Sequence, residues 1–321
     1  MELSVVTAVY NGAQYIEEAI DSILNQTYEA FEWIIVNDGS TDTTPYILDS
    51  ITDKRVRIIH NDQNKGTAAS LNKAIECARG DWIAIQDSDD KSVPHRLNTQ
   101  LAFLKQHPKT QLVGSLISCI PGAEKISSLR LRKEAEGSNR FKETEELMKN
   151  RFHGCHLAHG TVMYSRSLFN EVGGYNPAIK VAHDYDLFMR LYQVTDPYKL
   201  NEVLYLSRVH PNSLCRSDIE QTWREVVEVS TDYLKRMIPT TSKIILIGSP
   251  QACKQLMLLN KPFPIYEHID VSSLKGENHA DPSQHVILIL DHKHANRISD
   301  RMERKGFSLG ENLFKLWNVY G

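Results

Sequence analysis

The sequence predicts an α/β protein in which a mostly parallel β-sheet is flanked by helices and followed by a small C-terminal α/β domain. Two observations support this prediction. In the first hundred residues, short apolar strand-like runs alternate with segments of helical periodicity. Beyond Pro239-Thr240-Thr241 the same alternation starts again. We therefore expect two domains, residues 1–238 and residues 239–321, the second of unknown role.

The strand-like runs of the first domain are short and almost free of charge, as expected for buried strands. Strands are expected over 3–9, 33–36, 56–59 and 82–85. Helices are expected over 15–25, 44–51 and 67–78. Strands joined by helical crossovers form parallel sheets that are covered on both faces.

Acidic side chains follow two of these runs, where the predicted strands end. Asp38 comes after the second run, and Asp87, Asp89 and Asp90 come after the fourth. In open α/β sheets, ligands bind outside the carboxyl ends of the strands. We therefore expect these carboxylates to lie on one functional rim.

The rest of the first domain has weaker signals. Residues 121–151 are polar and charge-rich, and we expect a mobile loop followed by a helix. A strand is expected over 161–164, and helices over 166–172 and 184–193. The loop carries basic residues that could attract a phosphorylated acceptor, although a solvated face is the simpler interpretation: Lys125, Arg130, Arg132 and Lys133.

The expected C-terminal domain has strands over 243–247 and 285–290 and a helix over 296–305. Gly248-Ser249-Pro250 follows the first of these strands, where a dinucleotide fingerprint would begin, but the later glycines of that motif are missing. Docking, acceptor presentation or homo-oligomer formation through this domain is therefore preferred to a second nucleotide site.

Composition and charge exclude several functions. The formal net charge of -3 leaves no basic footprint for nucleic acid. The five cysteines are scattered and never form Cys-x-x-Cys, which favours a reducing compartment. Neither a secretion signal nor an apolar run near the ~20 residues of a membrane span is visible. We expect a cytoplasmic protein, with peripheral contact at the inner face of the membrane as an option.

Asp87-Ser88-Asp89 is the sharpest local feature. Two carboxylates two residues apart at a strand end can turn toward one ligand. Hard divalent cations such as Mn²⁺ or Mg²⁺ prefer oxygen ligands and share them with substrate phosphates. Asp and Ser are also ordinary turn residues, so the triplet taken alone is better explained as a structural turn.

An ordered set of motifs around this triplet resembles the family 2 glycosyltransferases, inverting enzymes of GT-A fold that include many bacterial surface-glycan enzymes. The resemblance covers residues from about 3 to about 215, and the order of the motifs is more specific than any one of them. In chain order they are Thr7-Ala8-Val9-Tyr10-Asn11, Val36-Asn37-Asp38-Gly39-Ser40, Asn64-Lys65-Gly66, Asp87-Ser88-Asp89, Gly173-Gly174-Tyr175 and His183-Asp184-Tyr185-Asp186-Leu187.

The resemblance implies roles for individual residues on the donor side. Asp38 would hydrogen-bond the base of the nucleotide, uracil in a UDP-sugar. Asp87 would approach the ribose or share the metal, and Asp89 would bind Mn²⁺ or Mg²⁺ on the diphosphate. The other residues implied in nucleotide-sugar binding are Thr7, Val9, Tyr10, Lys65, Gly66 and Ser88.

The resemblance also implies that Asp184 is the general base. In an inverting displacement the acceptor hydroxyl loses its proton as it attacks, and a nearby carboxylate can take that proton. Asp is also a favoured N-cap, so Asp184 fits a capping role as well. Many relatives have Glu before this Asp, whereas this chain has His183, which leaves the acceptor side open.

Two histidine-containing segments are further candidates. His210, in Arg208-Val209-His210, resembles a residue that can reach the metal or the diphosphate in relatives, although a lone His after a strand is more often structural. Residues 153–159 are rich in His and Cys but lack zinc-ligand spacing. An acceptor-binding loop, with His159-Gly160 near the active site, is the preferred interpretation.

The sequence therefore predicts a metal-assisted, inverting hexosyl- or N-acetylhexosaminyltransferase. It would move a sugar from a UDP-sugar to a hydroxyl of a glycan, a lipid-linked acceptor or a cell-wall or polysaccharide precursor. The alternative is a non-catalytic nucleotide-sugar-binding scaffold of the same fold. A nucleotidyltransferase would need a glycine-rich basic loop after the first strand, which Tyr10-Asn11-Gly12-Ala13-Gln14 is not.

Overall fold

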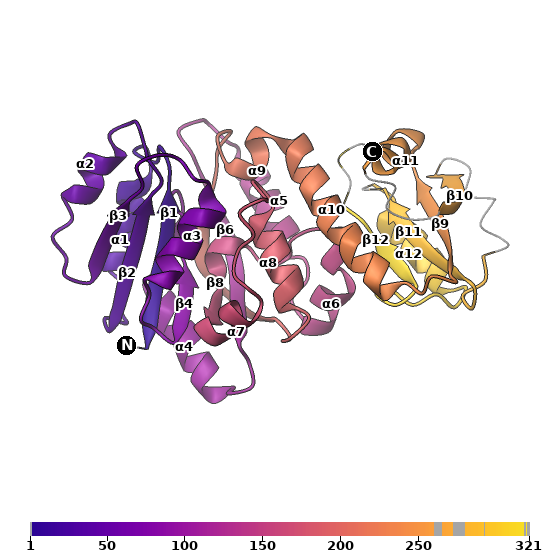
Figure 1. Ribbon diagram of the computed structural model, residues 1–321, viewed down its shortest axis with the longest axis horizontal. Helices are drawn as coiled ribbons and strands as arrows, with labels where there is room; N and C mark the ends of the chain where they lie inside the picture. The colour runs from indigo at the N-terminus through magenta and orange to yellow at the C-terminus, as the bar shows by residue number, and fades with distance from the viewer. Residues whose placement is uncertain (1, 260–264, 272–279, 292, 318, 320–321) are drawn as a thin grey trace. The chain divides into compact units, whose positions relative to one another are not determined.

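The computed structural model describes all residues except 1, 260–264, 272–279, 292, 318 and 320–321 (Figure 1). The chain divides into two compact units: residues 1–144 with 156–213, and residues 145–155 with 214–321. Residues 214–238, which the sequence analysis assigns to the first domain, thus group with the second unit. The domain boundary predicted at residue 238 stays a prediction.

The first unit is built on an eight-stranded sheet with the strand order β3-β2-β1-β4-β7-β6-β8-β5. Strands β1 to β4 pair in parallel, β7 runs antiparallel to both β4 and β6, β6 and β8 are parallel, and β5 is antiparallel to β8. The predicted α/β fold class with a mostly parallel sheet is confirmed. The strands are β1 (Leu3–Val9), β2 (Phe31–Asn37), β3 (Val56–His60), β4 (Trp82–Ile85), β5 (Lys91–Ser92), β6 (Leu112–Pro121), β7 (Met163–Ser165) and β8 (Tyr198–Val209).

The central strands form because their residues are apolar on both faces. Every residue of β2 is buried, and β1 is buried apart from one position. Such continuous apolar runs need helices on both faces, and crossover helices supply them. The helices that follow β1 to β5 in the chain are α1 (Ile16–Leu24), α2 (Thr44–Asp49), α3 (Thr67–Glu76) and α4 (Arg96–Gln106).

The segment expected to be a mobile loop is largely helical, so that expectation was wrong in part. Helix α5 (Ser128–Ser138) follows β6, and the Ser127 side chain caps it by accepting a hydrogen bond from the Arg130 N–H. Asn139, just after α5, exchanges two hydrogen bonds with the backbone of Ile117 at 2.9 and 2.8 Å. None of the α5 residues is buried, so apolar packing does not hold this polar segment in place. The local hydrogen bonds fix it instead.

A buried lysine ties the end of this segment to the sheet. Lys199 of β8 donates hydrogen bonds to the carbonyls of Ser138, Phe141 and His156 at 2.7, 3.1 and 2.7 Å. The chain then forms the 3-10 turn η2 (His159–Thr161), β7, α7 (Arg166–Glu171) and α8 (His183–Leu191). Lys199 therefore anchors the stretch that leads into η2 against β8.

The second unit has a four-stranded parallel sheet in the order β10-β9-β11-β12. Its strands are β9 (Lys243–Gly248), β10 (Ile265–Asp270), β11 (His285–Leu290) and β12 (Leu313–Lys315). Isoleucines from β9, β10 and β11 form its core together with residues of α12. The helices grouped with it are α6 (Thr144–Lys149), α9 (Leu214–Ser217), α10 (Ile219–Met237), α11 (Pro250–Leu258) and α12 (Ala295–Glu303), with the 3-10 turn η1 (Arg151–His153).

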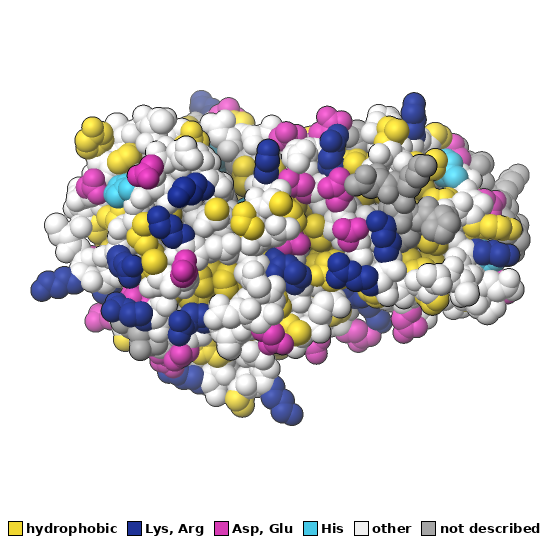
Figure 2. Space-filling view, viewed as in Figure 1, with side chains coloured by type: hydrophobic (Ala, Val, Ile, Leu, Met, Phe, Trp, Pro, Cys, Tyr) yellow, Lys and Arg dark blue, Asp and Glu magenta, His cyan; other side chains and the backbone are white. Residues whose placement is uncertain are grey.

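Charges of both signs are mixed on one face of the molecule (Figure 2). On the face seen in Figure 2, Lys and Arg side chains are interspersed with Asp and Glu. Among the residues that the structure describes, no helix is both long enough and apolar enough to cross a membrane. The described residues of the face in Figure 2 offer no broad surface of one charge, and the polar residues at the strand ends are the stronger candidates for a functional site.

Candidate active site

The acidic turn, residues 87–90, begins where β4 ends at the centre of the first sheet. Its entry is fixed by Gln86, whose carbonyl accepts a hydrogen bond from the Thr7 hydroxyl at 2.8 Å. The Gln86 side-chain amide then donates to the carbonyls of Asp87 and Asp90 at 2.9 and 3.0 Å. The Gln86 amide therefore holds the backbone of the turn together, and the carboxylates of the turn face outward or toward neighbouring elements.

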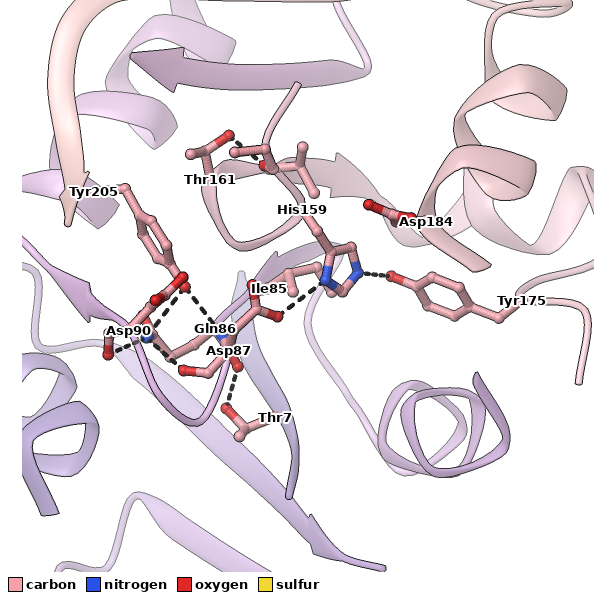
Figure 3. A network of polar contacts seen from close by, with 12 residues as sticks. Thr7, Ile85, Gln86, Asp87, Asp90, His159, Thr161, Tyr175, Asp184 and Tyr205 are labelled. Atoms are coloured by element: carbon pink, nitrogen blue, oxygen red, sulfur yellow. Dashed lines mark hydrogen bonds and ion pairs between the residues drawn. The ribbon is translucent and has the colours of Figure 1, made fainter. Parts of the chain in front are cut away.

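Asp87 faces a histidine from η2 (Figure 3). Its Oδ1 lies 3.0 Å from His159 Nδ1, and the other ring nitrogen, Nε2, lies 2.8 Å from the Tyr175 hydroxyl. The Tyr205 hydroxyl accepts a hydrogen bond from the Asp87 backbone N–H at 3.1 Å. A third of the Asp87 side chain, 33%, is exposed, so the carboxylate can also meet a ligand.

Asp89 faces a different histidine, from the end of β8. Its Oδ2 lies 2.9 Å from His210 Nε2, and 32% of the Asp89 side chain is exposed. Arg208 holds the backbone here by donating from Nε to the Asp89 carbonyl at 2.7 Å. The Arg208 guanidinium also pairs with Glu18 at 3.1 Å and lies over the Tyr15 ring. Asp89 is therefore presented by a rigid frame.

Electrostatics distinguishes two carboxylates of the turn, Asp90 and Asp87. Burial and the charges of Asp89 and Asp87 raise the pKa of Asp90 well above its usual range. Burial would also raise the pKa of Asp87, but the charge and hydrogen bond of His159, with the charges of His183 and Arg96, together outweigh burial and lower that pKa. Burial alone would lower the pKa of His159, but the charge and hydrogen bond of Asp87 and the charge of Asp184 together outweigh burial and raise that pKa. Asp87 is thus an ionised carboxylate beside an imidazole that favours protonation.

Asp184 lies in the first turn of α8, close to the same histidine. Its Oδ1 accepts a hydrogen bond from the Tyr185 backbone N–H at 2.7 Å. The carboxylate points from the start of α8 toward His159, and its charge also favours the protonated form of that ring (Figure 3). Asp184 is not the N-cap of α8, since the helix begins at His183 after the N-cap Ala182. Its side chain nevertheless bonds an N–H of the first turn, and its role as general base stays a prediction.

Asp38 is at the end of β2, where the sequence analysis predicts it, but it is only 2% exposed. Its carboxylate accepts hydrogen bonds from Asn61 Nδ2 and from the backbone N–H groups of Lys65 and Gly66, at 2.8, 2.9 and 2.8 Å. Asp38 therefore organises the loop that leads into α3. Lys65 and Gly66 are themselves exposed at this loop.

The other predicted donor-site residues differ in exposure. Thr7 is fully buried, and its hydroxyl also accepts a hydrogen bond from Trp33 Nε1 at 3.0 Å. Val9 is 2% exposed, whereas Tyr10 is 48% exposed. Ser88 faces the turn after β1, because a methyl group added at Gly12 would lie 3.7 Å from its hydroxyl oxygen. Thr7 and Val9 thus support the rim from below, while Tyr10 and Ser88 are accessible to a ligand.

The residues present fit a divalent cation at Asp89. A carboxylate oxygen and an imidazole nitrogen converge there at 2.9 Å, and both are groups that bind Mn²⁺. Within the described residues, no cluster of three or more His, Cys, Asp or Glu side chains forms a complete metal site. A cation held by Asp89 and His210 would therefore take its other ligands from a bound phosphate and water.

Comparison with known proteins decides the family. A family model described as "Glycosyl transferase family 2" matches residues 4–173. The chain is 31% identical over 249 residues to an uncharacterized glycosyltransferase of Rickettsia prowazekii, RP339, a match covering 76% of this chain and 74% of that protein. The chain belongs to glycosyltransferase family 2.

Further relatives of this family 2 glycosyltransferase agree. It is 34% identical over 215 residues to the putative glycosyltransferase EpsE of Bacillus subtilis, a match covering 64% of this chain and 73% of EpsE. Its fold resembles residues 1–349 of S. aureus TarS in complex with UDP, with a TM-score of 0.55 at 21% identity over 72% of this chain and 65% of that TarS fragment. It also resembles the mannosyltransferase PcManGT of Pyrobaculum calidifontis with GDP-Man and Mn²⁺, with a TM-score of 0.55 at 18% identity over 81% and 69% of the two chains. The predicted membership of glycosyltransferase family 2 and the predicted GT-A-type fold are confirmed.

The sequence analysis places His159-Gly160 near the active site of this family 2 glycosyltransferase, but it does not predict the contacts made there. The contact between Asp87 and His159 joins residues 72 positions apart, and Tyr205 and Asp87 are 118 apart. Nothing local predicts such pairs. Tyr175 carries a signal, because it follows Gly173-Gly174, which both have positive φ and mark a turn that only glycine adopts readily.

Proposed function

We propose that this chain transfers a sugar from a nucleoside-diphosphate sugar to an acceptor hydroxyl, with inversion at the anomeric carbon and with the help of a divalent cation. UDP-sugars carrying a hexosyl or N-acetylhexosaminyl group are the proposed donors. The proposed acceptor is a glycan, a lipid-linked glycan or a cell-wall or polysaccharide precursor. One observation carries the proposal: the acidic turn and Asp184 converge on His159 at the rim of the sheet.

The donor side of the proposal rests on the acidic turn. Asp89 and His210 would hold Mn²⁺ or Mg²⁺, which when bound would neutralise the charge on the leaving diphosphate. Asp87 would meet the ribose or share the cation. Support comes from the fold neighbours, since TarS structures contain UDP or UDP-GlcNAc and the PcManGT structure contains GDP-Man and Mn²⁺.

The nucleotide base is proposed to lie by the loop that Asp38 organises. Its carboxylate already accepts three hydrogen bonds, which hold the 61–66 loop in place. One carboxylate has about four lone-pair directions, so a fourth donor such as a uracil N–H can still bind. Tyr10, which is 48% exposed, supplies a ring against which the base can pack.

The chemical step is proposed as a single displacement. The acceptor oxygen attacks the anomeric carbon from the face opposite the leaving group, the bond to the diphosphate oxygen breaks, and the nucleoside diphosphate departs. Asp184 takes the acceptor proton as the new bond forms. Its Oδ1 is held by the Tyr185 N–H at 2.7 Å, which fixes the orientation of the carboxylate for this transfer.

Two broader proposals accompany this mechanism. Nucleotide sugars are made in the cytoplasm, so the enzyme is proposed to act there, with peripheral contact at the inner membrane face when its acceptor is lipid-linked. The domain proposed over residues 239–321 would serve docking, acceptor presentation or self-association, since its Gly248-Ser249-Pro250 turn lacks the dinucleotide fingerprint.

The direct test is release of nucleoside diphosphate from candidate donors. Purified protein would be incubated with UDP-GlcNAc, UDP-glucose and GDP-mannose, with Mn²⁺ or with EDTA, and with a panel of acceptor sugars. We expect Mn²⁺-dependent release from a UDP-sugar and a product of inverted anomeric configuration by NMR. Donor binding without any release would favour the non-catalytic scaffold, and a product of retained configuration would overturn the single displacement.

A further inference from the structure

Both ring nitrogens of His159 are used inside the protein. Nδ1 lies 3.0 Å from Asp87 Oδ1, Nε2 lies 2.8 Å from the Tyr175 hydroxyl, and 11% of the side chain is exposed. A ring held at both ends has one orientation, because turning it over would break both contacts. His159 is thus a fixed link from the acidic turn to Tyr175 (Figure 3).

The backbone around His159 is pressed against the acidic turn. A methyl group added at Gly160 would lie 2.0 Å from the Tyr205 hydroxyl and 2.7 Å from Asp87 Oδ2. Both distances are far below van der Waals contact, so no side chain fits at this position. The glycine therefore allows η2 to approach Asp87 closely enough for the neighbouring imidazole to bond it.

The far end of the link is anchored to α3. Asn72 clasps the backbone of Tyr175: its side-chain oxygen accepts from the Tyr175 N–H at 2.9 Å, and its amide donates to the Tyr175 carbonyl at 2.8 Å. Tyr175 is 1% exposed, and its hydroxyl lies 3.4 Å from that of Tyr164. The partner of His159 Nε2 therefore cannot move without disturbing α3.

The same ring contacts the start of α8. The rings of His159 and His183 meet edge-to-face with centroids 5.4 Å apart, and Tyr175 packs on His183 in the same way at 5.8 Å. His183 directly precedes Asp184. The three rings thus connect the turn that carries Asp87 with the helix that carries the proposed base.

We propose that His159 is a positioning residue: it holds the Asp87 carboxylate in one orientation and sets the acidic turn in register with Asp184. This inference rests on the proposed function for its effect on turnover, whereas the link itself is a property of the free protein. Loss of His159 should act on the chemical step, because a misplaced carboxylate slows that step more than it weakens donor binding.

Two substitutions of His159 separate positioning from packing. His159→Asn keeps a side-chain N–H at the same number of bonds from Cα as Nδ1, so it can still donate to Asp87. His159→Leu fills similar space without any donor. The matched control is His95→Asn, because His95 pairs with Glu202 at 2.9 Å but both side chains are about half exposed, at 49% and 51%.

Turnover is measured as UDP release from a UDP-sugar, with thermal unfolding as the check on folding. We expect His159→Leu to lower kcat by about 10- to 100-fold with a much smaller change in donor KM, as for the loss of one hydrogen bond to a charged group. His159→Asn should recover most of the lost kcat, and His95→Asn should match the wild type. Equal kcat for His159→Leu and His95→Asn, or no rescue by Asn, would overturn the proposal.

A second readout needs no nucleotide. In the wild type, the proton on His159 Nδ1 should give an NMR signal that is protected from exchange with water, is missing in His159→Asn and shifts in Tyr175→Phe. A ring proton that exchanges freely would overturn the link, whatever the activity. If the wild type releases UDP from no donor, the proposed function fails, and the ring proton still decides whether His159 holds Asp87.

Discussion

Asp87 and Asp89 lie two residues apart in one turn, and each faces a histidine at nearly the same distance, 3.0 and 2.9 Å. The two histidines are held differently. His159 bonds Tyr175 through its second nitrogen, so both ends of the ring are engaged within the protein. Within the described part of the chain, His210 uses Nε2 alone, and its ring packs on Tyr15 with centroids 5.1 Å apart.

This difference shows how one pair of residue types can serve two purposes. The pair of Asp87 and His159 is closed at both ends and therefore holds geometry. The pair of Asp89 and His210 joins two good cation ligands by one contact, which a bound Mn²⁺ can replace. Substitutions at Asp89 or His210 should thus alter metal dependence, and those at His159 should alter the rate at saturating metal.

Asp89→Asn should have the largest effect. It removes the charged oxygen proposed to hold the cation, so transfer should fall by about 10³-fold, consistent with the several kcal/mol that a bound metal contributes. Nucleotide affinity should become the same in Mn²⁺ and in EDTA. The comparison is made by measuring UDP release against Mn²⁺ concentration. A variant with wild-type metal dependence would remove Asp89 from the metal site.

Asp184→Asn should be nearly as damaging to transfer but should spare donor binding. Loss of the base costs about 10²- to 10⁴-fold in rate, whereas the amide still accepts the Tyr185 N–H. The measurements are UDP release and UDP affinity on the same preparation. Transfer near the wild-type rate would show that another group takes the proton.

His210→Asn tests the open half of the comparison. We expect the Mn²⁺ concentration for half-maximal UDP binding to rise by about 10-fold or more, because changes around a metal typically cost at least that much affinity. His159→Asn should leave the Mn²⁺ requirement unchanged. Calorimetric titrations at a series of Mn²⁺ concentrations give both values. The same Mn²⁺ requirement in the two variants would contradict the proposed difference between the Asp89–His210 and Asp87–His159 pairs.

Gly160→Ala tests the close approach of η2 to the acidic turn. The added methyl group would overlap the Tyr205 hydroxyl, which lies 2.0 Å away, so we expect a loss of about 1–3 kcal/mol in unfolding free energy. Gly137→Ala in α5 is the control, because nothing lies within 4 Å of its added carbon. The control should be neutral or stabilising in urea titrations. Equal effects of the two substitutions would contradict the packing described.

The Glu32 carboxylate makes its hydrogen bonds within the protein, with Ser4 and Arg79. Substituting Glu32 should therefore have the smallest effect on activity. Burial would raise its pKa, but hydrogen bonds from Ser4 and from the Arg79 backbone and side chain outweigh burial and lower that pKa. Because the folded pKa lies below the unfolded one, the stabilisation is present above the unfolded value of about 4.5 and is lost as pH falls through the folded pKa.

Glu32→Gln should therefore lower the unfolding free energy by about 1–3 kcal/mol at pH 7, with the difference shrinking in acid. UDP release per folded molecule should stay at the wild-type value. Glu143→Gln, at an exposed position, is the control for removing one negative charge. A difference between Glu32→Gln and the wild type that grows as pH falls would contradict the sign of the shift.

The central strands and the acidic residues that follow them were predictable from the sequence. The bounds predicted for the first and fourth strands are those of β1 and β4, because continuous apolar runs between turn residues leave little choice. β8 and α10 escaped prediction. β8 mixes exposed and buried positions with register shifts. The segment of α10 was not predicted, although its buried residues Trp223, Val227 and Leu234 recur at helical spacing.

The position of the candidate site at the rim followed from the chain order of the acidic residues. The contacts between the site residues did not follow from it. Asp38 and Asp87 were expected at strand ends, and both are there. The burial of Asp38, and the pairing of Asp87 with His159 across 72 residues, depend on how distant segments pack. Such contacts leave no periodicity or spacing in the sequence, so only the structure reveals them.

The most direct test of the account is a calorimetric titration of UDP into the wild-type protein, once with Mn²⁺ and once with EDTA. We expect binding that depends on Mn²⁺, because Asp89 and His210 together supply only part of a coordination shell that the diphosphate completes. Binding of equal strength in both conditions would contradict a metal-assisted donor site at the acidic turn. Absence of binding in both conditions would contradict the assignment of UDP-sugars as donors.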